Sequence, residues 1–424
     1  GAFRTLSNTY LTEVAYDWFD VIEKVPLVVL LRNREDSSAP IGVMELWHGN
    51  TSAFKDLALQ ILPQLMSKAL KKTGESKEIL ILVATSGDTG KAALAGFADV
   101  PQTKIMDFYP DNGVSKIQKL QMVTQTGSNV NVTAVRGNFD DCQNGVKNIF
   151  SDEKIRADLE NANVKLSSAN SINWGRLVPQ IVYYFSTYVE FIKAGNIKLG
   201  DQVNVVVPTG NFGNILAAYY ARKMGLPVKK LICASNINHV LTDFFQTGVY
   251  DRNRDFHKTI TPSMDILISS NLERLLYHET GGDVKLVQRY MQELNSTGKY
   301  KIDAPLKKRL DKIFYADYAT EAETSSVIKN LFDNFKYLVD THTAVALSVM
   351  GKYRRETKDT LPAIVASTAS PFKFTSAVLN ALAHAQQPQL APVVQGGQDH
   401  ALALDARDLP GRQVGNGHNL SAHQ

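Results

Sequence analysis

The chain lacks any long apolar segment and has few cysteines. Of its 424 residues 44% are hydrophobic, yet no uninterrupted apolar run approaches the roughly 18 residues that a membrane-spanning helix needs. Only Cys142 and Cys233 are present, and they have neither the CxxC spacing nor that of a zinc ligand set. The first ten residues contain no apolar core of a signal peptide. We therefore expect a globular protein of two or three domains in the reducing cytoplasm, with no membrane contact.

An excess of one charge and the common nucleotide and metal motifs are also missing. The 46 basic and 42 acidic residues leave a net charge of +4, and the two signs are interspersed. This distribution gives little support to nucleic-acid binding. HExxH, GxGxxG and the Walker A loop are absent; Gly90 and Lys91 resemble the last, but Thr85 and Ala92 stand where it requires Gly and Ser or Thr. The expected partner is a small molecule, with no nucleic acid and no bound metal.

Short apolar runs alternate with helical patterns along most of the chain. Lys77–Ala84 predicts a strand, the following TSGDTG a glycine turn, and KAALAGFADV a helix. Repetition of this order predicts a parallel sheet with helices on both faces. Ligands of such sheets lie beyond the carboxyl ends of the strands, where the glycine loops fall. The other strand candidates are Thr103–Tyr109, Asn129–Val135, Gln202–Val207, Val228–Ala234 and Ala363–Ser367, and Gln180–Lys193 has a helical pattern.

One lysine stands at the predicted start of an amphipathic helix. In Glu45–Gln60, ELWHGNTSAFKDLALQ, a tight polar turn precedes Lys55. The positive end of a helix dipole disfavours an ammonium and favours the free amine, which can attack an aldehyde. Lys55 is therefore a candidate Schiff-base lysine. The alternative is a solvated lysine at a helix start.

A glycine loop and a strand end complete a candidate site. In Thr209–Asn214, TGNFGN, Gly210 and Gly213 allow backbone amides to turn inward at a helix start, which suits a phosphate group. Ser367–Pro371, STASP, brings hydroxyls to the end of a buried strand. A lysine for an aldehyde, a phosphate cup and a hydroxyl for a pyridine nitrogen are what pyridoxal 5'-phosphate requires. Ordinary turns are the alternative reading of both loops.

Seven blocks of the chain, between about Val25 and about Leu382, carry a resemblance to a known family. They are HGNTSAFKD, ATSGDTGKAA, FYPDNGVSKIQKLQM, SSANSINWGRL, PTGNFGNILAAYYA, DTHTAVA and STASPFKF. In content and in order these blocks resemble the threonine synthase family, in its longer bacterial and fungal branch. The resemblance implies an enzyme that uses pyridoxal phosphate to convert O-phospho-L-homoserine and water into L-threonine and phosphate.

The resemblance assigns roles to individual residues. It makes Lys55 the cofactor-binding lysine and proton shuttle, Thr368 the partner of the pyridine nitrogen, and Asp88 a residue that faces the cofactor ring. The cofactor-phosphate cup is Gly210, Asn211, Phe212, Gly213 and Asn214. The substrate-binding residues are Ser86, Thr89, Lys116, Asn170, Ser171, Asn173 and Arg176. Lys116 and Arg176 can instead be surface charges, the polar residues of SANSIN can cap a helix, and His342 is expected to be a buried structural histidine.

The resemblance also implies the fold and its domains. We expect two open, mostly parallel sheets with helices on both faces, as in the β subunit of tryptophan synthase and other fold type II enzymes, with the cofactor in the interdomain cleft. The large domain is expected at 25–78 and 196–381 and the small substrate-closing domain at 79–195. The assembly is expected to be a monomer or a homodimer.

Both ends depart from the family pattern. The arm at 1–24 has one helical pattern, Leu11–Ile22, and lacks the family's Thr-Arg-Gly motif. The tail at 382–424 is rich in Gln, Ala, Pro, Gly and His, has little periodicity and is expected to be disordered. These ends leave open an inactive relative as one alternative. A second alternative is a phospho-lyase on the same scaffold that releases 2-oxobutyrate and ammonia, which the sequence alone does not separate from the synthase.

Overall fold

The computed structural model of the protein describes residues 25–30 and 39–384. The helix expected at Leu11–Ile22 lies outside the described residues. The tail was expected to be disordered from Leu382, but its first three residues are the end of helix α16 (Thr375–His384), so this boundary was wrong. The rest of the expected tail lies outside the described residues.

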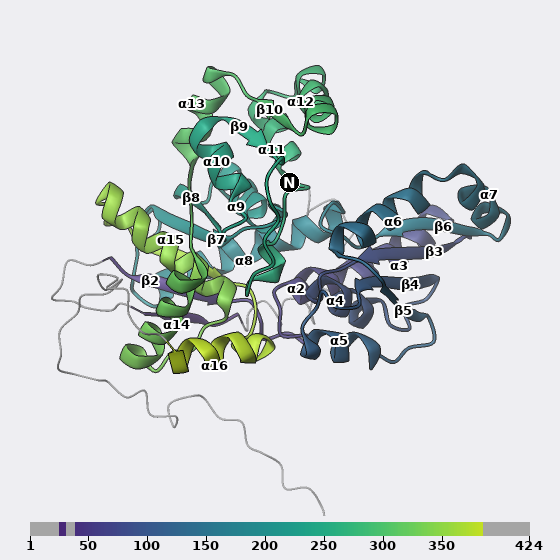
Figure 1. Ribbon diagram of the computed structural model, residues 1–424, viewed down its shortest axis with the longest axis horizontal. Helices are drawn as coiled ribbons and strands as arrows, with labels where there is room; N and C mark the ends of the chain where they lie inside the picture. The colour runs from purple at the N-terminus through teal and green to yellow at the C-terminus, as the bar shows by residue number, and fades with distance from the viewer. Residues whose placement is uncertain (1–24, 31–38, 385–424) are drawn as a thin grey trace, which may run out of the picture. The chain divides into compact units, whose positions relative to one another are not determined.

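The larger of two principal sheets has six strands in the order β1–β2–β12–β7–β8–β11 (Figure 1). Strands β1 and β2 pair antiparallel, whereas every other neighbouring pair is parallel. The strands are β1 (Leu27–Val29), β2 (Ile41–Glu45), β7 (Val203–Pro208), β8 (Val228–Ser235), β11 (Phe314–Tyr318) and β12 (Ala363–Ser367).

The smaller sheet has four parallel strands in the order β5–β4–β3–β6. They are β3 (Glu78–Ala84), β4 (Thr103–Pro110), β5 (Val130–Val135) and β6 (Val164–Ser168). A two-stranded antiparallel ribbon joins β9 (Val249–Asp251) to β10 (Lys299–Lys301).

The helices connect these strands. In the first half they are α2 (Lys55–Leu59), α3 (Ile61–Thr73), α4 (Asp88–Phe97), α5 (Lys116–Val123), α6 (Phe139–Ser151), α7 (Glu153–Asn161), α8 (Trp174–Lys193) and α9 (Gly213–Lys223). In the second half they are α10 (Val240–Thr247), α11 (Leu272–Glu279), α12 (Val284–Thr297), α13 (Ala304–Ile313), α14 (Glu321–Phe335), α15 (Thr341–Thr357) and α16, with short 3-10 turns η2 (Pro262–Met264) and η3 (Pro371–Phe374). No helix in these described ranges is both long and apolar enough to cross a lipid bilayer.

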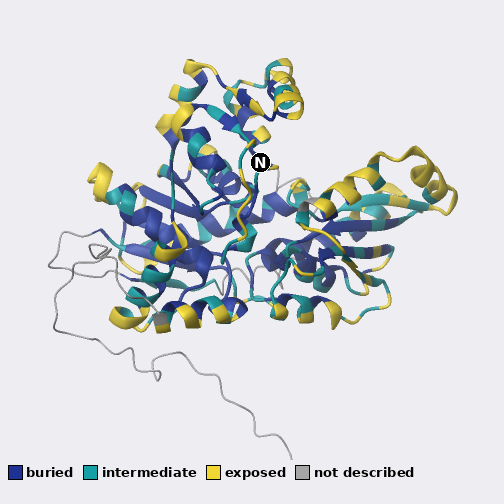
Figure 2. Ribbon diagram, viewed as in Figure 1, coloured by how far each residue is buried: buried dark blue, intermediate teal, exposed yellow. Residues whose placement is uncertain are grey.

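Both faces of the six-stranded sheet are covered, because its strands alternate between two apolar cores. In β7 the side chains of Val203, Val205 and Val207 pack with residues of α8, α9 and α10. Val206, on the opposite face, packs with residues of α14 and α15. Figure 2 shows these strands in dark blue between helices with yellow outer surfaces. Burial on both faces explains why these strands are continuous apolar runs.

The four-stranded sheet is built in the same way. In β3, Ile81 and Val83 pack against α4, while Leu82 packs on the other face against Cys142 and Val146 of α6. From the carboxyl end of each strand the chain runs through a turn into a helix: β3 into α4, β4 into α5, β5 into α6 and β6 into α8. The turn between β3 and α4 is TSGDTG.

The expected fold class and strands are confirmed. All six strand candidates are present with ends within one residue of those expected. The helix expected at Gln180–Lys193 starts earlier, at Trp174, and contains Pro179 near its beginning. Strand β6 is a short run with two serines, and the sequence patterns missed it. The division into domains at 25–78, 79–195 and 196–381 stays a prediction.

Candidate active site

Lys55 is the first residue of α2, and only 9% of its surface is exposed. Its Nζ lies 3.8 Å from Oδ2 of Asp88. Burial lowers the pKa of Lys55 to about 8; the charge of Asp88 opposes this shift, and those of Arg176 and Lys373 add to it. At a pH of about 8, half of these side chains therefore carry the neutral amine that can attack an aldehyde.

The polar turn before Lys55 is fixed by hydrogen bonds. The N–H and the hydroxyl of Thr51 donate to the buried carboxylate of Asp56, at 2.8 and 2.5 Å. The N–H of Phe54 donates to the carbonyl of Thr368 at 2.9 Å. A Cβ at Gly49 would lie 2.6 Å from Oδ2 of Asp56, so the turn needs a glycine there. These contacts join the start of α2 to the end of β12.

Thr368 follows β12 directly and is largely buried. Its hydroxyl makes no hydrogen bond within the described residues, although the Oγ of its neighbour Ser367 accepts from Nε1 of Trp47 and Oγ1 of Thr343, at 3.1 and 3.0 Å. The Thr368 hydroxyl is therefore free to meet a ligand.

A second buried lysine, Lys373, completes a charged cluster with Asp88 and Lys55. The sequence did not identify it as a site residue. Nζ of Lys373 lies 2.7 Å from Oδ1 of Asp88 and donates to the carbonyl of Thr51 at 2.8 Å. Gln118 donates from Nε2 to the same Asp88 oxygen at 2.9 Å. Burial alone raises the pKa of Asp88, but Lys373 and Lys55 outweigh it and hold that pKa well below its usual range. The carboxylate is therefore ionised between two lysines.

The loop between β7 and α9 has the backbone of an anion-binding site. Phe212 precedes α9 with a left-handed φ of 64°, and α9 starts at Gly213. A Cβ at Gly210 would lie 2.5 Å from the carbonyl oxygen of Ser263, so only glycine fits this close approach. The first N–H groups of a helix lack partners within it and attract anions.

Two side chains of this loop are directed into the protein. The ring of Phe212 packs 5.9 Å from that of Phe314 in the core. Oδ1 of Asn214 accepts hydrogen bonds from the hydroxyls of Tyr183, at 2.9 Å, and Tyr184. Nδ2 of Asn214 is buried and has no partner among the described residues. Phe212 can therefore serve a ligand only through its backbone.

Arg176, in the first turn of α8, is a buried cation with only 2% of its surface exposed. One guanidinium nitrogen, Nη1, donates to the carbonyl of Ala169 at 2.6 Å, but Nε has no partner and no carboxylate pairs with it in the described part of the chain. Burial lowers the pKa of Arg176 to about 10. A buried, unpaired guanidinium is costly, and an arriving anion would offset that cost.

The asparagines before α8 are already hydrogen-bonded. Asn170 donates to the carbonyl of Ala84 at 2.9 Å, at the end of β3. Asn173 caps α8: its Oδ1 accepts from the N–H of Gly175 at 2.9 Å and its Nδ2 donates to the carbonyl of Ser168 at 2.8 Å. Asn173 therefore caps α8, and its expected contact with the substrate stays a prediction. Ser171 lies closer to the glycine loop, because a Cβ at Gly213 would be 3.6 Å from its Cβ.

The remaining candidates lie at the starts of α4 and α5. Ser86 and Thr89 are half-buried on either side of Asp88. Lys116 is exposed at the first position of α5 and has no partner among the described residues. Gln118, two residues further, reaches Asp88, so α5 touches the cluster although Lys116 itself does not.

His342 is a structural histidine, as expected. Its Nδ1 pairs with Asp340 at 2.8 Å, and its Nε2 accepts from the N–H of Ser263 at 3.3 Å. Its ring meets that of Phe374 edge to face. Both ring nitrogens are therefore engaged by the protein.

The residues around Lys55 fit pyridoxal 5'-phosphate. Lys55 presents an amine whose pKa, about 8, is near physiological pH. Among the described residues, the N–H groups of Asn211 and Phe212 in the glycine loop and the hydroxyl of Thr368 have no hydrogen-bond partner. Within the same residues Arg176 pairs with no carboxylate, so it adds a cation for a further anionic group.

Comparison with known families identifies the chain. Residues 19–290 match the family described as pyridoxal-phosphate dependent enzyme, and residues 343–401 match the family described as threonine synthase, C-terminal. The second match extends beyond Leu382, where the recognised blocks end.

The relatives found are threonine synthases and threonine synthase-like proteins. Human threonine synthase-like 1 is 44% identical over 347 residues, which are 80% of this chain but only 46% of that protein. The chain thus spans about half the length of this relative. Threonine synthase of Saccharomyces cerevisiae is 38% identical over 392 residues, covering 88% of this chain and 74% of the yeast protein.

The same relationship holds in three dimensions. The crystal structure of threonine synthase from Brucella melitensis with bound pyridoxal phosphate superposes with a TM-score of 0.76 at 37% identity, and the match covers 92% of this chain and 81% of that one. The cofactor is pyridoxal 5'-phosphate. The chain belongs to the pyridoxal-phosphate-dependent enzymes, in the group formed by threonine synthases and threonine synthase-like proteins.

Proposed function

We propose that the protein is a threonine synthase, which converts O-phospho-L-homoserine and water into L-threonine and inorganic phosphate. In this reaction the Cγ–O bond to phosphate breaks, Cβ loses a proton and Cγ gains one, and water supplies the hydroxyl at Cβ while its remaining proton goes to the departing phosphate. The observation that carries the proposal is the buried, unpaired guanidinium of Arg176, whose charge acts on Lys55. It supplies an anion site beside a reactive amine, as a phosphorylated amino acid requires.

Lys55 holds the cofactor and moves protons. Its Nζ would hold the cofactor through the aldehyde group, and its neutral amine would accept the proton that leaves the substrate Cα. A pKa of about 8 allows this nitrogen both to take and to return protons near neutral pH. The bound cofactor supplies an electron sink for the negative charge that forms at Cα.

The other residues bind and orient. The backbone of Gly210, Asn211, Phe212, Gly213 and Asn214 holds the cofactor phosphate at the positive end of α9. The Thr368 hydroxyl would be the partner of the pyridine nitrogen and would leave it unprotonated, and Asp88, between Lys55 and Lys373, would face the cofactor ring. The Ser86 and Thr89 hydroxyls and the N–H groups of their loop bind the substrate carboxylate.

The substrate phosphate is held by charge and by polar side chains. Arg176 provides the buried cation, Lys116 an exposed one that approaches as the small domain at 79–195 closes over the substrate, and Asn170, Ser171 and Asn173 the polar rim. The domain at 25–78 and 196–381 carries the cofactor. A buried guanidinium that binds the substrate phosphate also binds the departing phosphate ion, which can then exchange protons with the substrate.

One experiment tests the proposal. The purified protein is incubated with pyridoxal phosphate and O-phospho-L-homoserine, and phosphate, threonine and 2-oxobutyrate are measured in the same sample. We expect equal amounts of phosphate and threonine. Phosphate with 2-oxobutyrate would assign a phospho-lyase instead, and no phosphate despite bound cofactor would assign neither reaction to this chain.

A further inference from the structure

A short segment before α11, Ser269–Asn271, holds the carbonyl groups of the glycine loop. The hydroxyl of Ser269 donates to the carbonyl of Gly210 at 3.0 Å. The backbone N–H and Nδ2 of Asn271 both donate to the carbonyl of Asn211, at 3.2 and 2.9 Å. Ser270 adds a hydrogen bond of 3.3 Å from its hydroxyl to Oδ1 of Asn211. Two consecutive carbonyls of the loop are therefore turned toward this segment.

The direction of these carbonyls sets the direction of the neighbouring N–H groups. No cis peptide bond occurs in the described chain, and in a trans peptide the C=O and the N–H point in opposite directions. The carbonyls of Gly210 and Asn211 face the Ser269–Asn271 segment, so the N–H groups of Asn211 and Phe212 face away from it. Neither N–H meets an acceptor among the described residues. Both are thus turned toward the space before α9.

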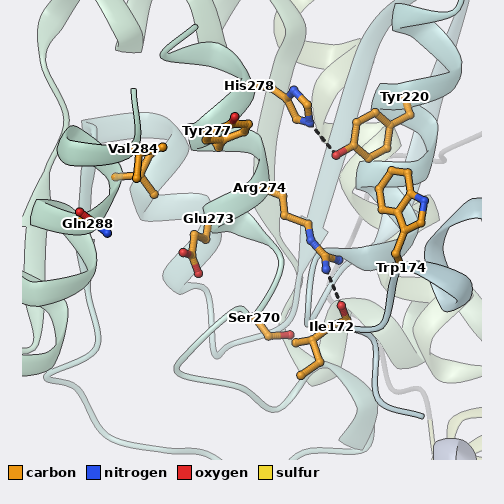
Figure 3. Close-up of a pocket in the computed structure, with 11 residues that line it drawn as sticks. Ile172, Trp174, Tyr220, Ser270, Glu273, Arg274, Tyr277, His278, Val284 and Gln288 are labelled. Atoms are coloured by element: carbon orange, nitrogen blue, oxygen red, sulfur yellow. Dashed lines mark hydrogen bonds between the residues drawn. The ribbon is translucent and has the colours of Figure 1, made fainter. Parts of the chain in front are cut away.

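Asn271 is the central member of the segment. It is fully buried and its side chain is hydrogen-bonded on both sides. Its Oδ1 accepts from Nη1 of Arg274 at 2.7 Å, which leaves Nδ2 to donate to Asn211 and, at 3.2 Å, to the hydroxyl of Ser171. Arg274 is itself held by the carbonyl of Ile172, as the close-up of the adjoining 580 Å³ pocket shows (Figure 3). The hydrogen bond from Arg274 therefore sets the orientation of the Asn271 amide, with Oδ1 toward Arg274 and Nδ2 toward the Asn211 carbonyl.

We propose that Asn271 is a positioning residue for the cofactor phosphate. With Ser269 it holds the Gly210 and Asn211 carbonyls outward, so that the Asn211 and Phe212 N–H groups converge on the phosphate oxygens. This inference rests on the proposed phosphate cup at Gly210–Asn214. Through its contact with Ser171, Asn271 also joins that cup to the loop proposed for the substrate phosphate.

Asn271→Asp separates positioning from folding. An aspartate has nearly the same shape and keeps its contact with Arg274, now as an ion pair. It keeps the backbone N–H bond to the Asn211 carbonyl but loses the side-chain donor to that carbonyl and to Ser171. Ser269→Ala is the second variant, because it removes one of the carbonyl contacts without adding charge. The matched control is Glu273→Gln, an exchange between carboxylate and amide in the first turn of the adjoining helix α11, at an exposed side chain without a hydrogen bond in the described structure.

The measurement compares two ligands that differ only in the phosphate. Each protein is titrated with pyridoxal 5'-phosphate and with pyridoxal, binding is followed by the visible absorbance of the lysine adduct, and the ratio of the two dissociation constants is taken. A general loss of structure weakens the binding of both ligands. A glycine loop whose N–H groups point away from the phosphate weakens the binding of pyridoxal 5'-phosphate alone. We expect Asn271→Asp to reduce the preference for the phosphorylated ligand by about 10-fold or more, and Ser269→Ala by about 3-fold, with Glu273→Gln unchanged.

Each other outcome counts against the inference. An unchanged ratio in Asn271→Asp would overturn it. A change in Asn271→Asp with none in Ser269→Ala would also overturn it, because repulsion by the new charge would then explain the result. Wild-type protein that binds neither ligand would instead refute the proposed active site, so the two failures are distinguishable.

Discussion

Replacing Asp88 by Asn should make Lys55 a weaker base. Asp88 is the anion nearest to the Lys55 ammonium, at 3.8 Å from Nζ, and both side chains are buried. Asparagine retains the shape of the side chain and can still accept from Gln118, so the exchange removes charge with little change in packing.

The geometry sets the size of the effect. Two unit charges 3.8 Å apart attract with about 4 kcal/mol at an effective dielectric constant of about 20, which corresponds to about 3 pKa units. The effect on Lys55 is smaller than this full value, because the Asp88 carboxylate is shared with a second lysine, Lys373, at 2.7 Å from Oδ1. We therefore expect the pKa of Lys55 to fall by about 1 to 3 units.

The assay is the rate at which the visible cofactor absorbance appears after mixing with pyridoxal phosphate, measured from about pH 6 to about pH 10. Only the neutral amine reacts, so the rate of the wild type should rise with pH around a midpoint near 8. In Asp88→Asn the midpoint should move to lower pH. Asp111→Asn is the control, since it makes the same exchange at a half-exposed carboxylate paired with Lys119. A midpoint for Asp88→Asn that is unchanged or higher would refute the reasoning.

Three further variants test the cluster and the anion site. Lys55→Ala should abolish borohydride-reducible attachment of the cofactor, and attachment that persists would assign another lysine. Arg176→Ala should raise KM for O-phospho-L-homoserine by about 10-fold or more, because it removes the buried cation from a charged contact; an unchanged KM would remove Arg176 from the phosphate site. Lys373→Met should lower the free energy of unfolding, measured with urea, by about 3 to 5 kcal/mol, since it leaves buried Asp88 without its nearer cation. A loss below about 1 kcal/mol would show that this ion pair does not stabilise the fold.

The sequence predicted those parts of the fold that have a local cause. The strands of the sheet centres, such as β7 and β12, are short apolar runs because both of their faces are buried. Strand order has no such local signal: β12 pairs with both β2 and β7, which are far from it in the chain. Strand β6 is short and only half-buried, so its composition resembles that of a loop.

Some residues of the candidate site likewise have a local signal in the sequence, and others have none. Lys55 and the glycine loop could be recognised because each stands at a helix start behind a characteristic turn. Lys373 and Asn271 could not, because their roles arise only when distant segments meet, at Asp88 and at Asn211. Lys373 lies in the last block that resembles the family, STASPFKF. The neighbouring residues in the sequence, however, do not distinguish a buried lysine from an exposed one.

The position of β12 has a consequence for the order in which the protein can fold during synthesis. All four strands of the smaller sheet lie between Glu78 and Ser168, so that sheet can form while the ribosome is still adding chain. The six-stranded sheet must wait, because β2 and β7 are joined only by β12 at Ala363–Ser367. Until then both strands present unpaired edges that can pair with other chains. We therefore expect association between nascent chains to be most favourable in the interval between the synthesis of β7 and that of β12.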